Sequence, residues 1–220
     1  MACEVCNNMV SDNRSNFPAI WEILQNEYPN PQPALHFNNP LELLVATILS
    51  AQCTDAQVNM VTEKLFKKYR SVEDFANADQ ETLEKEIYST GFYRNKAKHV
   101  RESAQLIITE FGSEVPNTME DLLKLPGVAR KTANIVLARG FGVVDGVAVD
   151  THVKRLSGRL GFSKNKDPVK IEQDLMQLTR REEWDDLSMT LILHGRNVCD
   201  ARKPKCDICK ISELCPSSLV

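Results

Sequence analysis

The sequence predicts an all-α protein, and three observations support this. Apolar residues recur at intervals of three and four along most of the chain, and no stretch alternates apolar and polar residues as a half-buried strand does. Residues that favour helix N-termini, namely Ser, Thr, Asp and Asn, precede most of these stretches. With 220 residues and 42% hydrophobic content, the chain can bury one large core or two small ones.

Start and stop signals divide the chain into about ten helices. Asn39-Pro40 begins an apolar helix that we expect to be buried, because it is apolar on most sides. Asn95 is expected to begin a long amphipathic helix, and Thr118-x-x-Asp121 resembles a capping box. The expected helices are Phe17–Tyr28, Leu41–Ser50, Asp55–Tyr69, Gln80–Tyr88, Lys96–Phe111, Asp121–Leu125, Ala129–Gly140, Thr151–Leu160, Val169–Leu178 and Glu183–Gly195.

Charge is unevenly distributed along the chain. The net charge of −3 and the pI of 5.9 argue weakly against a nucleic-acid partner. Residues 90–164, however, hold 12 Lys and Arg against 7 Asp and Glu, a local charge of +5. No run approaches the roughly 18 apolar residues of a membrane span, and the N-terminus lacks the pattern of a signal peptide. We therefore expect a cytoplasmic protein, associated with the nucleoid if the source is prokaryotic.

The segment Leu125–Ala133 is typical of a tight turn between two helices. Pro126 removes a backbone donor, and Gly127 allows the chain to reverse. Free N–H groups at the start of the following helix suit a phosphate oxygen. Lys131 would lie in the first turn of that helix, where the helix dipole disfavours an ammonium and so favours a neutral, nucleophilic amine. The structural alternative is a turn that only connects two helices.

Four cysteines near the C-terminus form the most specific pattern in the chain. Their spacing is C-x6-C-x2-C-x5-C, and these short loops let four sulfurs converge on one centre. On chemistry alone, the centre is either a tetrahedral zinc ion or a [4Fe–4S] cluster. The four are Cys199, Cys206, Cys209 and Cys215. We expect the remaining pair near the N-terminus, Cys3 and Cys6, to be free thiols.

These motifs together resemble the endonuclease III family of DNA glycosylases. The matching segments are Leu125–Val128 with Arg130–Ala133, Val149–His152, Leu49–Asp55, Ser89–Ala97 and the cysteine spacing. Two positions depart from the family pattern. Ala129 stands where the family usually has a second glycine, and Phe92 stands where members often have leucine.

The resemblance implies an architecture and a cofactor. It implies two helical domains with a DNA-binding cleft between them, a helix-hairpin-helix motif and a C-terminal [4Fe–4S] cluster loop held by the four cysteines. One domain would span residues 33–143, and the other would combine residues 1–32 with 144–220.

The resemblance also implies roles for individual residues. Lys131 would be the nucleophile, and Asp150 would stabilise positive charge on the sugar. The residues expected to bind DNA are Gln52, Phe92, Gly127, Val128, Ala129 and Arg130. Those expected to line the cleft are Ser50, Asp55 and His152.

The implied function is base-excision repair by a bifunctional enzyme. Such a DNA glycosylase and AP lyase would act as a monomer on double-stranded DNA, removing oxidised pyrimidines through a lysine Schiff base. The alternatives are a monofunctional adenine or thymine mismatch glycosylase, a non-catalytic DNA-binding protein that keeps the hairpin, and a zinc-bound structural protein. Lys131 argues against the first, and Lys131 together with Asp150 argues against the second.

Overall fold

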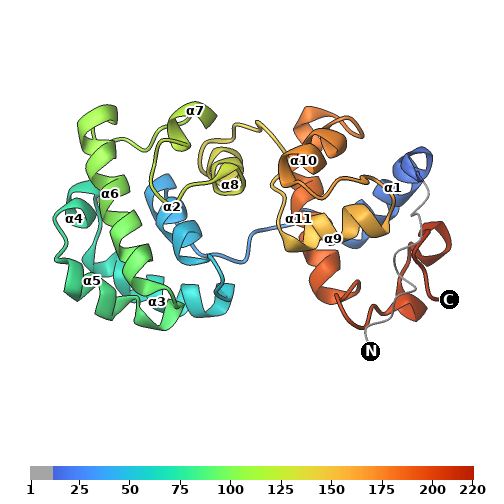
Figure 1. Ribbon diagram of the computed structural model, residues 1–220, viewed down its shortest axis with the longest axis horizontal. Coiled ribbons are helices and arrows are strands. Elements are labelled where there is room, and N and C mark those ends of the chain that lie inside the picture. The colour runs from blue at the N-terminus through green and yellow to red at the C-terminus, as the bar shows by residue number, and fades with distance from the viewer. Residues whose placement is uncertain (1–11) are drawn as a thin grey trace. The chain divides into compact units, whose positions relative to one another are not determined.

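The computed structural model describes residues 12–220, and every regular element in that range is a helix (Figure 1). The prediction of an all-α fold is confirmed. Cys3 and Cys6 lie outside the described residues. None of the helices within residues 12–220 is long and apolar enough to cross a membrane.

The chain divides into two compact units, which are described separately. Unit 1 comprises Met1–Gln32 and Gly146–Val220, and unit 2 comprises Pro33–Asp145. The helices of unit 2 are α2 (Pro40–Leu49), α3 (Asp55–Lys68), α4 (Val72–Ala76), α5 (Gln80–Glu86), the 3-10 turn η3 (Tyr88–Thr90), α6 (Tyr93–Phe111), α7 (Met119–Leu122) and α8 (Arg130–Phe141). Those of unit 1 are α1 (Phe17–Glu27), α9 (Thr151–Arg159), α10 (Pro168–Met176) and α11 (Trp184–Asn197), with short 3-10 turns at Cys206–Ile208 and Ser212–Leu214.

The core of unit 2 is built around α2. Seven consecutive residues of this helix, Leu43–Leu49, are buried, which confirms the prediction from its apolar sequence. It packs against α3, α6 and α8. Helix α6 contributes one apolar face, whose members include Ala97, Val100, Ala104 and Ile107. The hairpin and the segment before α3 therefore lie on a rigid, densely packed scaffold.

Unit 1 is formed by the two ends of the described chain. Phe17, Ile20 and Leu24 of α1 share a core with apolar residues of α9, α10 and α11. Phe17 stacks edge-on against Phe162 with ring centroids 5.1 Å apart. Residues that are far apart in the sequence therefore depend on each other for burial.

Helix N-caps explain why the helices begin where they do. In six helices the predicted type of cap residue accepts a hydrogen bond from a backbone N–H in the first turn. These residues are Asn39, Thr54, Asp79, Thr118, Asp150 and Asp167.

The structure differs from the predicted helices by more than two residues at three places. Helix α4 was not predicted, although Ser71 and Asp74 form a reciprocal capping box before its buried Phe75. Helix α6 begins at Tyr93 instead of Lys96, because Phe92 takes a left-handed conformation that starts the helix without a side-chain cap. Helix α7 ends at Leu122, since the next residues already form the tighter hydrogen bonds of the turn, with Leu125 N–H donating to Leu122 O at 3.1 Å.

Candidate active site and cluster site

Two residues of α6 contact the hairpin turn between α7 and α8. Ser103 of α6 donates a hydrogen bond to the carbonyl of Pro126 at 2.9 Å. Gly127 has a φ of +78°, and a Cβ placed there would lie 2.7 Å from Nδ1 of His99. The turn therefore requires glycine at this position for its backbone angle as well as for space.

Ala129 is in a different situation. It is the N-cap of α8, with a φ of −104° and a ψ of 171°, an extended conformation open to any residue. Within residues 12–220, the backbone N–H groups of Gly127 and Ala129 donate to no protein acceptor. The departure from the family pattern at Ala129 therefore leaves the turn and its amides intact.

Lys131 is exposed in the first turn of α8. No ion pair or hydrogen bond holds its side chain among the described residues. The nearby Lys124, in contrast, pairs with Asp121 at 2.7 Å. The Lys131 amine is thus available to a substrate.

Asp150 begins α9 as its N-cap. One carboxylate oxygen, Oδ1, accepts from the N–H groups of His152 at 2.7 Å and Val153 at 2.8 Å. These bonds fix the side chain and leave the second oxygen, Oδ2, without a protein donor in the described part of the chain. The Asp150 carboxylate can therefore cap α9 through Oδ1 while Oδ2 remains available for another interaction. The neighbouring His152 contacts Arg155, its Nδ1 lying 3.2 Å from an Arg155 nitrogen.

Gln52 and Phe92 lie in two short connections of unit 2. Gln52 is exposed between α2 and α3, where Ser50 donates to Thr47 O at 2.8 Å and Asp55 occupies the first turn of α3. Phe92 is 63% exposed immediately before α6. Its ring therefore does not pack in the core of unit 2.

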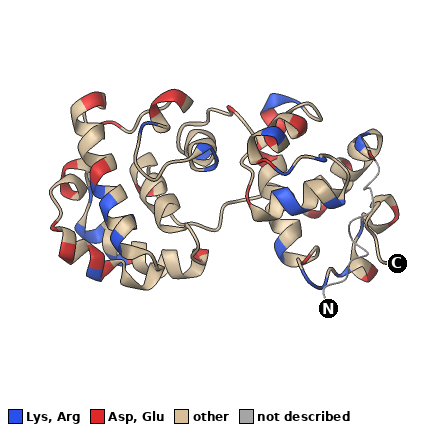
Figure 2. Ribbon diagram, viewed as in Figure 1, with Lys and Arg blue, Asp and Glu red and all other residues tan. Residues whose placement is uncertain are grey.

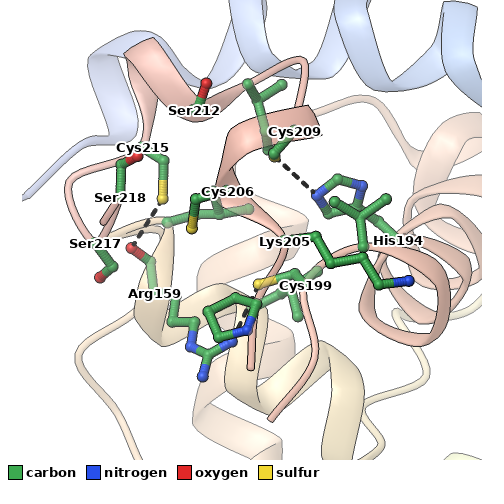
Figure 3. A pocket seen from close by; sticks show the side chains of 15 residues that line it. Arg159, His194, Cys199, Lys205, Cys206, Cys209, Ser212, Cys215, Ser217 and Ser218 are labelled. Atoms are coloured by element: carbon green, nitrogen blue, oxygen red, sulfur yellow. Dashed lines mark hydrogen bonds between the residues drawn. The ribbon is translucent and has the colours of Figure 1, made fainter. Parts of the chain in front are cut away.

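The four C-terminal cysteines surround one hollow in unit 1 (Figure 3). All four are free thiols and half-buried. Burial raises the pKa of the Cys209 and Cys215 thiols, and the negative charge of the neighbouring cysteines raises it further. A metal centre binds cysteine as the thiolate, so these thiols would lose their protons when a metal centre binds.

Sequence reasoning missed two residues that contact these sulfurs. Arg159 of α9 donates to Cys199 Sγ at 3.2 Å and also to the carbonyls of Asp200 and Ala201. Its sequence position, 40 residues before Cys199, carries no signal of this contact.

The second residue is His194 of α11. Its Nε2 lies 3.5 Å from Cys209 Sγ, and its Nδ1 lies 3.2 Å from the hydroxyl of Tyr28. Burial lowers the pKa of His194, which favours the neutral ring. Burial also raises the pKa of Tyr28 to about 12. In the neutral ring of His194 one nitrogen donates and the other accepts, so the ring contacts Tyr28 and Cys209 with opposite hydrogen-bonding roles. Such outer contacts orient the ligands of a metal centre.

The donor set fits an iron–sulfur cluster better than a single ion. Four thiols and no carboxylate line the hollow, a choice typical of zinc or iron–sulfur sites. Within residues 12–220, however, no three such side chains are close enough together to hold a single metal ion. A single zinc ion needs every sulfur about 2.3 Å away, whereas a cluster of four irons separates its ligands further.

The uneven charge of the sequence follows the helices. The acidic residues of positions 71–86 belong mainly to α4 and α5, while the Lys and Arg residues of positions 90–164 are spread over α6, α8 and α9 (Figure 2). Helix α8, which begins at the hairpin, carries Arg130 and Lys131 in its first turn and no acidic residue there.

Comparison with known proteins decides the family. Residues 45–181 match the model of the HhH-GPD superfamily base excision DNA repair protein, and residues 199–215 match the iron-sulfur binding domain of endonuclease III. The Endonuclease III of Synechocystis sp. is 54% identical over 196 residues, which is 89% of this chain and 90% of that protein. The chain belongs to the endonuclease III family.

Solved structures of the family agree with this. A non-covalent Endonuclease III–DNA complex has a TM-score of 0.90 at 40% identity, over 95% of this chain and 97% of that one. A trapped Endonuclease III–DNA covalent intermediate gives the same values. As a member of this family, the chain is a DNA-binding DNA glycosylase with AP lyase activity, and its cofactor is a [4Fe–4S] cluster. The predictions of family, enzyme class and cofactor are confirmed.

Proposed function

We propose that this enzyme removes oxidised or ring-saturated pyrimidines, such as thymine glycol, from double-stranded DNA and then cleaves the strand through an imine on Lys131. The observation that carries the proposal is the exposed, unpaired Lys131 amine in the first turn of α8, beside a turn with two free amides. The neutral form of an amine is the nucleophile.

The chemistry assigns each atom a role. Lys131 Nζ bonds to the sugar C1′ while the bond from C1′ to the damaged base breaks and the base leaves. Asp150 stabilises the positive charge that develops on the sugar. The C1′–O4′ bond then breaks and opens the sugar ring: O4′ takes up a proton, and C1′ forms the protonated imine with Nζ. The imine acidifies the 2′ carbon, so that a 2′ proton is lost and the 3′ phosphate leaves as its carbon–oxygen bond breaks. If water were the nucleophile, the reaction would stop at the abasic site. Strand cleavage therefore needs an amine, which can form the imine.

DNA binding is proposed for the hairpin and for two exposed side chains. The amides from Gly127 to Arg130, including Val128 and Ala129, would bind a backbone phosphate. Gln52 and Phe92 would enter the duplex where the damaged nucleotide has been flipped out, at a cost of a few kcal/mol. Ser50, Asp55 and His152 would line the site that receives the base. An aromatic side chain such as Phe92 can stack on bases as well as wedge between them.

The four cysteines are proposed to bind the cluster as thiolates. The cluster, when bound, would hold together residues 199–215, a segment with little regular structure of its own. We further propose that the enzyme acts on nucleoid DNA as a monomer, without a partner subunit.

Borohydride trapping tests the proposal. The full-length enzyme is mixed with a duplex that holds one thymine glycol, and borohydride reduces any imine to a stable adduct. We expect an adduct and strand cleavage from the wild type, and neither from Lys131→Ala, which should still bind the duplex. Lys124→Ala is the matched control, because Lys124 lies in the same hairpin region but pairs with Asp121.

Each other outcome has a defined meaning. Cleavage by Lys131→Ala at the wild-type rate would overturn the role of Lys131. Trapping of an abasic-site duplex without trapping of the thymine glycol duplex would overturn the proposed substrate class and leave the lyase step intact.

A further inference from the structure

Two residues of the proposed DNA contact are held in a strained backbone conformation. Gln52 has a φ of +53° and Phe92 a φ of +47°, in the left-handed region that residues other than glycine rarely adopt. In the described chain only Asn30 and Ser113 share this feature. Strain of this kind persists only where surrounding contacts impose it, and it concentrates at functional sites.

Lys96 makes the contacts that join the two strained segments. It lies on α6, one turn after Phe92, and is only 4% exposed. Its Nζ donates to Leu49 O at 2.7 Å and to Thr90 O at 2.7 Å, and its own backbone N–H donates to Phe92 O at 3.1 Å. Leu49 ends α2 three residues before Gln52, and Thr90 ends η3 two residues before Phe92.

The two carbonyls are suitable partners for an ammonium. The last carbonyls of a helix have no partner within the helix and lie at its negative end. Across residues 12–220, no carboxylate pairs with the Lys96 ammonium, so its charge is held by backbone alone. A second hydrogen bond, from Gln57 Nε2 to Ser89 Oγ at 2.8 Å, joins α3 to η3.

We infer that Lys96 is a positioning residue that couples Gln52 to Phe92, so that both side chains enter the duplex as one rigid pair. The inference rests on the proposed function, which places these two side chains in the DNA. A buried lysine with a purely structural role would stabilise unit 2 without linking the action of one loop to the other. The two roles therefore differ in a measurable coupling.

A double-mutant cycle measures that coupling. The probe is 2-aminopurine placed opposite a tetrahydrofuran abasic analogue in a duplex, at saturating full-length holoenzyme, because its fluorescence rises when bases are unstacked. We expect Phe92→Ala and Lys96→Met each to reduce the fluorescence rise roughly threefold. If the two residues act together, the two losses should not add in the double variant. Adding Lys96→Met to Phe92→Ala should cause no further loss, and the same should hold in Gln52→Ala.

Controls keep the result specific. Lys98→Met removes a lysine from the exposed side of α6, where it pairs with Glu102 at 3.8 Å, and should leave the fluorescence unchanged. If Lys96→Met does not fold, as judged by circular dichroism, the cycle is repeated with Lys96→Gln. In the wild type, the backbone amides of residues 50–53 and 90–92 should gain protection from hydrogen exchange together when DNA binds, and separate responses would overturn the inference.

The outcomes separate this inference from the proposed function. If Phe92→Ala and Gln52→Ala retain the full fluorescence rise, the proposed DNA contacts of these two residues are wrong. The coupling proposed for Lys96 is then overturned as well. If they lose the rise but Lys96→Met keeps it, or if the losses add, only the positioning role of Lys96 is overturned. Trapping by Lys131 is unaffected by either result.

Discussion

At the scale of single residues, Asp150 has an observed role as a helix cap and a proposed role in catalysis, and substitutions can separate the two. Its Oδ1 accepts hydrogen bonds from the N–H groups of His152 and Val153, and Oδ2 accepts from no protein donor within residues 12–220. Asparagine caps a helix as well as aspartate does, whereas alanine does not. Asp150→Asn therefore removes the charge and keeps the cap, while Asp150→Ala removes both.

We expect Asp150→Asn to slow base excision by about 10²–10³-fold, the usual cost of losing one group that stabilises developing charge. Its free energy of unfolding should change by only a few tenths of a kcal/mol, while Asp150→Ala should lose about 1 kcal/mol. Single-turnover excision and urea unfolding measure the two quantities. Wild-type turnover in Asp150→Asn would reduce Asp150 to a helix cap.

Lys96 shows the limit of reading single residues from a sequence. A lysine within an amphipathic helix is expected to face solvent, yet this one is buried, which lowers the pKa of its ammonium despite the opposing effect of nearby Cys53. Its two carbonyl partners belong to segments 47 and 6 residues away. Only the folded packing of α2 against α6 brings them together.

At the scale of elements, local signals predicted most helices because capping is local chemistry. Asn39, Thr54 and Asp79 cap the helices that their positions predicted. Helix α4 was missed although Ser71-x-x-Asp74 is a capping signal, because the helix has only five residues and its acidic surroundings are typical of a solvated face. The start of α6 was missed because the backbone of Phe92, and no cap side chain, sets it.

The hairpin gives a prediction at this scale from two neighbouring positions. Gly127→Ala places a Cβ at a φ of +78° and 2.7 Å from His99 Nδ1, so the turn must shift. We expect an affinity loss of about tenfold or more for a duplex with an abasic analogue, equal to about 1.4 kcal/mol. Ala129→Gly changes a position with extended backbone and should alter affinity by less than about threefold.

Fluorescence anisotropy titration measures both variants on the same duplex. Lys131→Ala can serve as the background, so that no turnover disturbs the binding equilibrium. Equal affinities for Gly127→Ala and the parent would show that the hairpin amides do not set the binding of phosphate.

At the scale of the whole molecule, the two units have separate cores. Every buried residue of the core of unit 2 lies between Leu43 and Leu137, whereas the core of unit 1 draws on Phe17–Leu24 and on Val147–Ile211. The sequence motifs indicated which segments carry chemistry, but the pairing of both chain ends in unit 1 depends on long-range packing. No local sequence pattern predicts that the rings of Phe17 and Phe162 are in contact.

Loss of the cluster should therefore damage the units unequally. The only regular elements of residues 199–215 are two 3-10 turns, and Ile211 is the only buried residue in this segment. We expect Cys206→Ser to abolish the visible absorption of the cluster and to reduce hydrogen-exchange protection in residues 146–220 and in α1, whose side chains share that core. Protection within residues 33–145 should be retained.

Cys53→Ser is the matched control, since Cys53 is a half-buried cysteine packed against the core of unit 2 and should leave the absorption intact. The physical reason for the asymmetry is that a metal centre substitutes for apolar burial only where burial is scarce. The core of unit 2 is supplied by α2, α6 and α8, so the helix that carries Lys131 needs no iron to fold. Equal loss of protection in both units of Cys206→Ser would contradict this, because it would make the cluster a determinant of the fold around Lys131 as well.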